Sequence, residues 1–362
     1  MPTIRADALQ KLVSDIFVKA GTSRAQGDRI AESLVGANLT GHDSHGVVRV
    51  PWYVQKQVSG EFVTDQKLKV ISETPVLAVV DAQYGFGQSM APQAVRMGLD
   101  KCKAMGLSAI AMRNSGHVGR VGEWAEMAAA EGIVSIHYVN AAASQLVAPY
   151  GGVDRRFSTA PYACGIPRPG ADPLILDFAT SIVAEGKVLV ASQGGKKLPA
   201  NALIAQDGQM SGDPHVLYGD FDPKAMRSYK NGKGAIRAFG EHKGSGLAFM
   251  CEILGGALTG TGAANEARPQ WANGMLSFYI DPAKIDPDGF FPKEVTRYTS
   301  FVKSSKPSVK DKPVLVPGEP ELATRRDRLA NGVPLPDDTW HLIVGAAKGV
   351  GIDEARLKEA LA

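Results

Sequence analysis

The chain has 362 residues, of which 44% are hydrophobic and 21% charged, a composition typical of a soluble globular protein that is too long for one ordinary core. We therefore expect two or three lobes. A formal net charge of +3 is too small and too dispersed to indicate a nucleic acid or an anionic membrane as a partner.

Neither a secretion signal nor a membrane anchor is expected. The first residues, MPTIRADALQKLVSDIF, carry polar side chains every few positions and lack the apolar core of a signal peptide. No uncharged apolar run approaches the length that spans a bilayer. The three cysteines are scattered without CxxC spacing, which favours reduced thiols in a cytoplasmic protein over a zinc site or a disulfide framework.

Helical patterns dominate both ends of the chain. One helix is expected from about Ala6 to Ala20, and a second follows Thr22 or Ser23, either of which could cap it. We therefore expect a mostly helical lobe formed by residues 1–74 plus 310–362. Its C-terminal helices are expected at residues 319–329, 337–348 and 353–361.

Short apolar runs alternate with helical stretches in the middle of the chain, which indicates an α/β lobe over residues 75–309. Helices are expected at about 90–105 and 124–130. Residues 213–240 are rich in Gly, Asp and Lys with weak periodicity, so we expect a long surface loop there. Strands are expected at residues 76–82, 107–113, 133–139, 174–178, 202–205 and 275–280.

The segment GHDSHGVVRVPWY concentrates chemically useful side chains. Within a few residues it carries the Ser44 hydroxyl, the His45 imidazole, the Arg49 guanidinium and the Tyr53 phenol. In a helix, His45, Arg49 and Tyr53 would share one face, because they are spaced four residues apart. That face could transfer a proton, bind a carboxylate through two hydrogen bonds and donate a further one. The alternative is an exposed polar helix edge.

Pro51 limits this interpretation, because proline inside a helix breaks a backbone hydrogen bond. Either the helix begins near Val50 with Pro51 in its first turn, or it begins earlier and is kinked. In the first case His45 and Arg49 lie on the lead-in loop.

The usual sequence sign of a dinucleotide site is missing. No G-x-G-x-x-G motif lies between a strand and a helix, and there is no Walker A loop. The nearest match, GTGAAN at residues 260–265, follows a helical stretch instead of a strand. From the residues alone, this argues against a Rossmann dehydrogenase.

The histidines allow several kinds of site. His42 and His45 are three residues apart, but a third metal ligand at suitable spacing is missing, so no metal is expected. Ser44, His45 and Asp177 could be nominated as a hydrolase triad, although adjacent Ser and His rarely face each other and no GxSxG elbow exists. His117 lies in SGHVG, a glycine-flanked loop after a strand, where α/β enzymes place functional groups. The alternative for His117 is a turn histidine bonded to backbone.

Long segments of the chain resemble the type 2 malate/L-lactate dehydrogenase family, which includes ureidoglycolate, sulfolactate and hydroxycarboxylate dehydrogenases and a cyclic imine reductase. Its members share an SHG segment followed by an arginine, here Arg49. The likeness covers nearly the whole length, and the FGEHKG version is most similar to the hydroxycarboxylate dehydrogenase B branch. The further segments are NSGHVGRVGEWAE (114–126), VAPYGG (147–152), LDFATS (176–181), FGEHKGSGLAFMCEILGGALTG (239–260) and LVPGEPE (315–321).

The resemblance implies NAD or NADP bound on a non-Rossmann α/β fold. Thr180 or Ser181 could cap the helix after the strand at 174–178 and leave amide donors for a phosphate. Lys243 is a cation beside glycines, which allow close approach to a pyrophosphate. The cofactor contacts implied by the resemblance are Asn140, Asp177, Phe178, Ala179, Thr180, Lys243, Gly244, Pro317, Gly318 and Glu319.

The resemblance leaves two histidines open as the proton donor. His117 is similar to the general acid/base of some relatives, whereas others use the Ser44–His45 pair with an aspartate, for which Asp177 is the candidate. Two departures from relatives, Gly116 in NSGH and Ala160 in STAP, put the substrate more in doubt than the reaction.

We therefore predict an NAD(P)-dependent dehydrogenase that interconverts a 2-hydroxy acid and a 2-oxo acid, with Arg49 and Tyr53 binding substrate. Reduction of a cyclic imine carboxylate is the alternative within redox chemistry, and a Ser44 hydrolase is the alternative outside it. The family implies a homodimer, with the helical lobe serving substrate binding and dimerisation. The sequence does not identify the hydroxy acid or the preferred dinucleotide.

Overall fold

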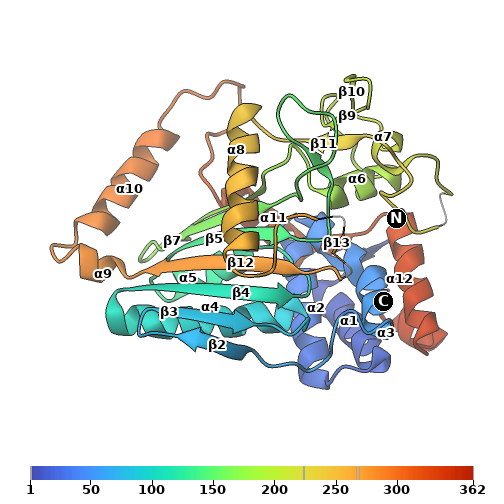
Figure 1. Cartoon of the computed structure of the whole chain (residues 1–362), viewed down its shortest axis with the longest axis horizontal. Helices are drawn as coiled ribbons and strands as arrows, with labels where there is room; N and C mark the ends of the chain where they lie inside the picture. The colour runs from blue at the N-terminus through green and yellow to red at the C-terminus, as the bar shows by residue number, and fades with distance from the viewer. Residues whose placement is uncertain (1, 223–224, 266, 269, 362) are drawn as a thin grey trace.

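The computed structural model describes residues 2–222, 225–265, 267–268 and 270–361. Its centre is a seven-stranded mixed sheet with the strand order β2-β3-β4-β12-β5-β7-β8 (Figure 1). β3 and β4 pair in parallel and the remaining neighbours pair antiparallel. A Rossmann fold requires a mainly parallel sheet, so this topology agrees with the missing G-x-G-x-x-G motif. The strands are β2 (Lys69–Glu73), β3 (Leu77–Asp81), β4 (Leu107–Ser115), β5 (Val134–Ala141), β7 (Pro161–Ile166), β8 (Leu174–Ala179) and β12 (Asn273–Ile280).

Helices cover both faces of this sheet. α4 (Gly87–Met105) packs against β4 and β12, α5 (Gly122–Ala130) packs against β5 and β7, and α8 (His242–Cys251) rises above β12 in Figure 1. α8 continues into the π-helical turn η3 (Glu252–Ala257), which contacts β5 and β12. The sheet and α4 share a core with buried side chains from both. This arrangement confirms the expected α/β layering, and most expected strands and helices are found within a few residues of their predicted bounds.

The two ends of the chain form one helical unit, as expected. Ser23 caps the second helix, because its hydroxyl accepts the Gln26 backbone N–H at 3.3 Å. Leu9, Phe17 and Ile343 are fully buried in its core. Its elements are β1 (Thr3–Ile4), α1 (Ala6–Ala20), α2 (Arg24–Leu39), α3 (Val50–Val58), α11 (Glu319–Asn331), β13 (Val333–Pro334), α12 (Asp337–Gly349) and α13 (Glu354–Glu359), with β1 paired to β13.

A third core lies beside a four-stranded sheet with the order β10-β9-β11-β6, of which only the strand at 202–205 was predicted. The long surface loop predicted at 213–240 is wrong in part, because this segment contains a short helix with Leu217 and Tyr218 buried and a strand that is buried throughout. The elements here are β6 (Val147–Ala148), α6 (Glu185–Ser192), β9 (Leu203–Ile204), β10 (Met210–Ser211), α7 (His215–Tyr218) and β11 (Ala235–Arg237).

Three further differences concern single elements. β2 pairs with β3, so residues 69–73 belong to the main sheet and not to the helical part. β7 lies inside the same sheet without having been predicted. α9 (Pro282–Ile285) and α10 (Phe290–Lys303) follow β12, and α10 projects from the body at the left of Figure 1. Among the described residues, no helix combines the length and apolarity needed to cross a membrane.

Candidate active site

A cavity of about 220 Å³ brings distant segments of the chain together. Its ionisable lining residues include His45, Arg49 and His117. Trp52 and Trp271 contribute apolar wall. His45 and Arg49 lie in the lead-in to α3, and His117 lies in the loop after β4. The cavity therefore combines cationic, proton-transferring and apolar surfaces, as expected of a small-molecule site.

The residues before α3 do not form the continuous α-helix that would place His45, Arg49 and Tyr53 on one face. α3 begins at Val50 with Pro51 in its first turn, which confirms the first of the two alternatives. The preceding residues form two 3₁₀ turns, 43–45 and 47–49. The interpretation of His45, Arg49 and Tyr53 as one face of a single helix is therefore wrong.

Gly46 allows these two turns to pack against α2. A Cβ at this position would lie 2.2 Å from Oδ1 of Asn38, which is buried. Asn38 binds both turns, because its amide nitrogen donates to Asp43 at 2.6 Å and its Oδ1 accepts the Val47 N–H at 2.8 Å. The glycine of the SHG segment thus fixes the backbone that carries the functional side chains.

The two candidate histidines lie face to face. The rings of His45 and His117 are nearly parallel at 14°, with centroids 5.5 Å apart. Burial, followed by the charges of His117 and Arg49, holds the pKa of His45 well below its usual value. Burial and Arg49 lower the pKa of His117 to about 3. Both rings are therefore neutral at pH 7 in the absence of a bound anion.

Ser44 and His45 are in contact, contrary to the expectation that adjacent residues would not face each other. Ser44 Oγ lies 2.9 Å from His45 Nδ1. Asp177 takes another partner, because its Oδ2 accepts the backbone N–H of Gly122 at 2.7 Å. In a hydrolase triad the nucleophile contacts Nε2 and the acid contacts Nδ1, so this arrangement does not match one.

The other imidazoles do not assemble a metal site. His42 Nε2 lies 3.4 Å from a carboxylate oxygen of Glu321. His137 is fully buried between the hydroxyls of Ser135 and Ser277. Over the described ranges, no group of three or more His, Cys, Asp or Glu side chains is placed to hold a metal ion.

His117 is enclosed by rings and anchored through one nitrogen. The Tyr53 hydroxyl lies 2.5 Å from His117 Nδ1, and Gln88 contacts that hydroxyl from the other side at 2.9 Å. The ring centroids of Trp52 and Trp271 are 6.0 and 5.5 Å from that of His117. Tyr53, expected to bind substrate, is fully buried with its hydroxyl directed at His117.

Arg49 has an acidic partner that the sequence did not indicate. Its Nη2 lies 3.1 Å from Glu185 Oε2, and its Nε donates to the backbone carbonyl of Ser44 at 2.7 Å. The second Glu185 oxygen accepts the Tyr218 hydroxyl at 2.5 Å. A Cβ on Gly186 would lie 2.6 Å from Arg49 Nη2, so a glycine lets the start of α6 approach the guanidinium.

A second cavity of about 140 Å³ shares His45 with the first. The stretch Asp177–Ala179 lines it, together with Arg120 and Lys187. Arg120 is buried, and although one terminal nitrogen donates to Glu126 at 2.5 Å, its Nη1 has no hydrogen-bond partner among the described residues. A buried guanidinium N–H beside a cavity is suited to an anionic or carbonyl-bearing ligand.

The other expected cofactor contacts do not line either cavity. Asn140 is fully buried, and its side-chain nitrogen donates to Glu252 and to the Gly262 carbonyl at 3.0 and 2.8 Å. Lys243 is exposed near the start of α8. The further expected cofactor contacts that line neither cavity are Thr180, Gly244, Pro317, Gly318 and Glu319.

The expected helix cap after β8 is wrong. α6 begins only at Glu185, with Ala184 as its N-cap. The Thr180 hydroxyl donates to the backbone carbonyls of Thr159 and Ala160, and Ser181 donates to that of Val183. These hydroxyls therefore fix the loop that separates the cavities from the small sheet.

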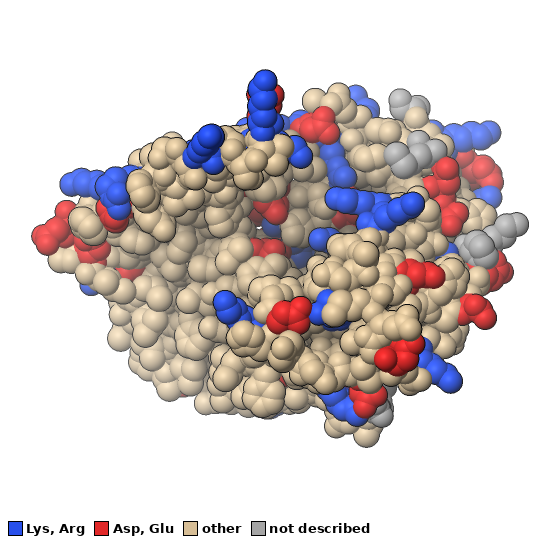
Figure 2. Space-filling view, turned by 90° about the horizontal axis from the view of Figure 1, so that it is seen from above, with Lys and Arg blue, Asp and Glu red and all other residues tan. Residues whose placement is uncertain are grey.

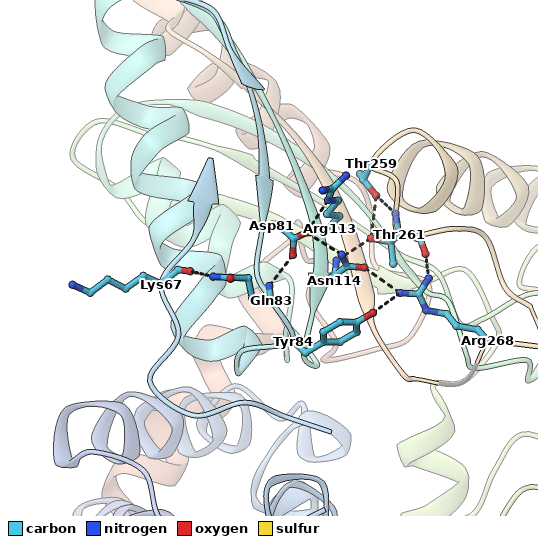
Figure 3. Close-up of polar contacts among 9 residues, drawn as sticks. All are labelled: Lys67, Asp81, Gln83, Tyr84, Arg113, Asn114, Thr259, Thr261 and Arg268. Carbon is cyan, nitrogen blue, oxygen red and sulfur yellow. Dashed lines mark hydrogen bonds and ion pairs between the residues drawn. The ribbon is translucent and has the colours of Figure 1, made fainter. Parts of the chain in front are cut away.

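A polar network joins the end of β4 to Arg268 (Figure 3). Asn114, at the end of β4, donates to Asp81 at 3.1 Å and accepts from Arg268 at 3.1 Å. Arg268 also donates to the carbonyl of Thr261 and, through Nε, to that of residue 270 at 3.0 Å. The network thus ties the segment before Trp271 to the strand that leads to His117.

Several site residues escaped sequence analysis. Gln88, Glu185 and Trp271 are single side chains outside the recognised segments, and no motif or spacing marks them. A polar residue at the expected start of a helix was the weak signal that Gln88 offered.

The comparisons with known proteins agree over most of the chain. The malate/L-lactate dehydrogenase family model matches residues 4–344. The chain belongs to this family. It is 36% identical to hydroxycarboxylate dehydrogenase B of Escherichia coli K12 over 98% of this chain and 96% of the relative. It is 34% identical to the Δ¹-pyrroline-2-carboxylate/Δ¹-piperideine-2-carboxylate reductase of Pseudomonas syringae pv. tomato, over 78% of this chain and 80% of that one.

A solved structure of a candidate malate/lactate dehydrogenase from E. coli has the same fold. It superposes with a TM-score of 0.91 at 34% identity and covers all of both chains. As a member of the malate/L-lactate dehydrogenase family the protein is an oxidoreductase, and the mixed sheet is the non-Rossmann fold that the resemblance implied.

Proposed function

We propose that this protein interconverts a 2-hydroxy acid and its 2-oxo acid with NAD or NADP. The observation that carries the proposal is the convergence of Arg49, His45 and His117 on one cavity. A 2-oxo acid presents a carboxylate beside a carbonyl. The guanidinium binds the former, and an imidazole donates to the oxygen of the latter.

The two groups have separate tasks in reduction. When a hydride is added to the carbonyl carbon, negative charge develops on its oxygen. The proton that completes the alcohol comes from His117 or His45 in its imidazolium form, taken up once the substrate carboxylate has bound, and the ring returns to the neutral state. Oxidation runs the same steps in reverse. Trp52 and Trp271 exclude water from this oxygen, which strengthens the hydrogen bond that stabilises it.

The hydride would be supplied by a nicotinamide dinucleotide held against the second cavity. Asp177, Phe178 and Ala179 line that cavity, as the resemblance requires. Lys187 and Arg120 Nη1, which has no hydrogen-bond partner among the described residues, offer donors for a polar, anionic molecule. The residues here fit such a group. Asn140 and Thr180 support the fold around it instead, because their side chains are already hydrogen-bonded. Lys243, Gly244 and residues 317–319 stay proposals from the resemblance alone.

Reduction of a cyclic imine carboxylate is the second candidate. It needs the same carboxylate contact and the same donor, and the 34% identical relative from P. syringae is named for it. A Ser44 hydrolase has less support, because the Asp177 carboxylate is bound to Gly122 and not to His45.

We also propose a cytoplasmic homodimer. Phe290, Tyr298 and Phe301 are exposed on α10, the helix that projects from the body. Seen from above, the lower left of the molecule is broadly uncharged, although charges of both signs gather at its far left end (Figure 2). A second copy that covers α10 would bury these rings. The free cysteines suit a reducing compartment.

Nucleotide binding tests the redox proposal. NADH or NADPH should raise the thermal unfolding temperature of the purified protein, since a ligand that binds the folded state stabilises it. A screen of 2-oxo acids and cyclic imines with each nucleotide then identifies the substrate. Lys187→Ala and Lys243→Ala, compared with the exposed Lys196→Ala as control, test which lysine contacts the dinucleotide. If neither nucleotide binds at near-millimolar concentration, the redox proposal fails.

A further inference from the structure

Gln88 is a fully buried polar residue directly behind the candidate histidine. It lies in the first turn of α4, where its side-chain nitrogen is 2.9 Å from the Tyr53 hydroxyl and 3.1 Å from the backbone carbonyl oxygen of His117. The helix start is pressed against this loop, because a Cβ on Gly87 would lie 2.3 Å from the same carbonyl oxygen. The three groups are therefore held at fixed separations.

The carbonyl of His117 determines which way the Gln88 amide points. A carbonyl oxygen only accepts hydrogen bonds, so the atom of Gln88 that faces it must be the NH₂ group. The opposite orientation would place two buried acceptor oxygens against each other. The same NH₂ group therefore donates its second hydrogen to the oxygen of Tyr53.

This donation fixes the direction of the next hydrogen bond. Because the Tyr53 oxygen accepts from Gln88, its own hydrogen is free to point to His117 Nδ1, which lies 2.5 Å away. A nitrogen that accepts this hydrogen bond carries no proton. We propose that Gln88, acting through Tyr53, holds neutral His117 in the tautomer whose proton is on Nε2.

The consequence is a histidine that presents an N–H to its surroundings and not a lone pair. Nδ1 is occupied, and Nε2 has no hydrogen-bond partner within the described part of the chain, while the residue itself lines the main cavity. An N–H suits the carbonyl oxygen of a 2-oxo acid, on which negative charge develops during reduction. Gln88 and Tyr53 are positioning residues in this scheme, since neither lines the cavity.

Nitrogen chemical shifts of the histidine ring test the tautomer directly. In ¹⁵N-histidine-labelled protein at neutral pH, the signals assigned to His117 through their loss in His117→Ala should show a pyridine-type Nδ1 and a pyrrole-type Nε2. The opposite pattern in the native protein would overturn the proposal. This measurement needs neither substrate nor cofactor, so it is independent of the proposed function, on which only the kinetic arm rests.

Reversing the polarity of the chain tests the role of Gln88. In Gln88→Glu the carboxylate accepts the Tyr53 proton, the Tyr53 oxygen then accepts from Nδ1–H, and the two ring signals should exchange types. Gln93→Glu on the same helix is the matched control and should leave them unchanged. Should Gln88→Glu not fold, Tyr53→Phe removes the donor and should give mixed tautomers. Retention of the native pattern in a folded Gln88→Glu or Tyr53→Phe protein would refute the role.

Steady-state kinetics test the consequence for turnover, with the 2-oxo acid that the screen shows to be reduced fastest as substrate. Gln88→Glu should lower kcat for reduction by about 10²- to 10⁴-fold, because the ring would offer a lone pair to the substrate oxygen. KM for the dinucleotide should change little. A normal kcat with exchanged ring signals would show that the tautomer of His117 is irrelevant to turnover. An absence of turnover in the native protein would instead count against the proposed function, while the shifts still decide the tautomer.

Discussion

Arg49 and Glu185 form an ion pair at the wall of the main cavity, with 3.1 Å between Nη2 and Oε2. Both side chains are largely shielded from solvent, at 15% and 17% exposure. The pair joins the lead-in of α3 to the first turn of α6, and Tyr218 binds the other Glu185 oxygen. A substrate carboxylate at Arg49 would therefore meet a guanidinium that is already partly neutralised.

Removing this negative charge should favour an anionic substrate. Glu185→Gln keeps an oxygen for Arg49 while it abolishes the competing charge, so we expect KM for a 2-oxo acid to fall about 3- to 10-fold, a change of the size of one weakly screened charge interaction. Glu185→Ala loses the orientation of Arg49 as well and should raise KM. Steady-state kinetics of both variants check this. A higher KM in Glu185→Gln would mean that the charge of Glu185 assists binding.

Arg49 itself should be needed for the substrate and not for the nucleotide. Lysine cannot reproduce two hydrogen bonds in one plane, so Arg49→Lys should raise KM for a 2-oxo acid by about 10- to 150-fold, and Arg49→Met by more. Nucleotide binding, measured by fluorescence titration, should be almost unchanged. A variant that loses nucleotide affinity but handles the oxo acid normally would place Arg49 on the cofactor side.

The stacked histidines should differ in their effect on turnover. Replacing the residue that transfers the proton by alanine should lower kcat by about two to four orders of magnitude, while the affinity for the nucleotide is preserved. His117→Ala and His45→Ala, compared in single-turnover reduction, identify it. Ser44→Ala should follow the effect of His45→Ala, because Ser44 Oγ contacts Nδ1 of that ring at 2.9 Å. Near-normal rates in both histidine variants would eliminate the proton-transfer assignment.

Buried neutral histidines should make the fold sensitive to acid. Burial lowers the pKa of His117 and of His137 to about 3 each. Between pH 3 and about pH 6.5, these histidines are protonated in the unfolded chain but stay neutral in the folded chain. The free energy of unfolding therefore falls as the pH falls. His137→Gln should reduce this slope by about 1.4 kcal/mol per pH unit. Urea unfolding between pH 4.5 and 7.5 measures the slope of the free energy of unfolding against pH, and the exposed His341→Gln is the control. Equal slopes in the His137→Gln and His341→Gln variants would contradict the burial argument.

Local sequence patterns determined the individual elements. The run from Ala6 to Ala20 forms its helix, and Ser23 caps the next, because apolar spacing and capping are properties of neighbouring residues. Pro51 likewise restricted α3 to a start at Val50 or a kink, and the start at Val50 is found. The missing glycine motif correctly predicted a sheet that is not of the Rossmann type.

The site was predictable only as a set of residues and not as an arrangement. Ser44, His45 and Arg49 stand out in the sequence, but the helix face inferred for them does not exist. The stack of His45 on His117 depends on packing between the lead-in of α3 and the loop after β4, and the Arg49–Glu185 pair spans 136 residues. The periodic spacing of apolar residues indicates which side chains share one face of a single helix or strand. Contacts between elements are set by how separate cores pack, so only the tertiary structure decided which charges and hydrogen bonds each functional side chain meets.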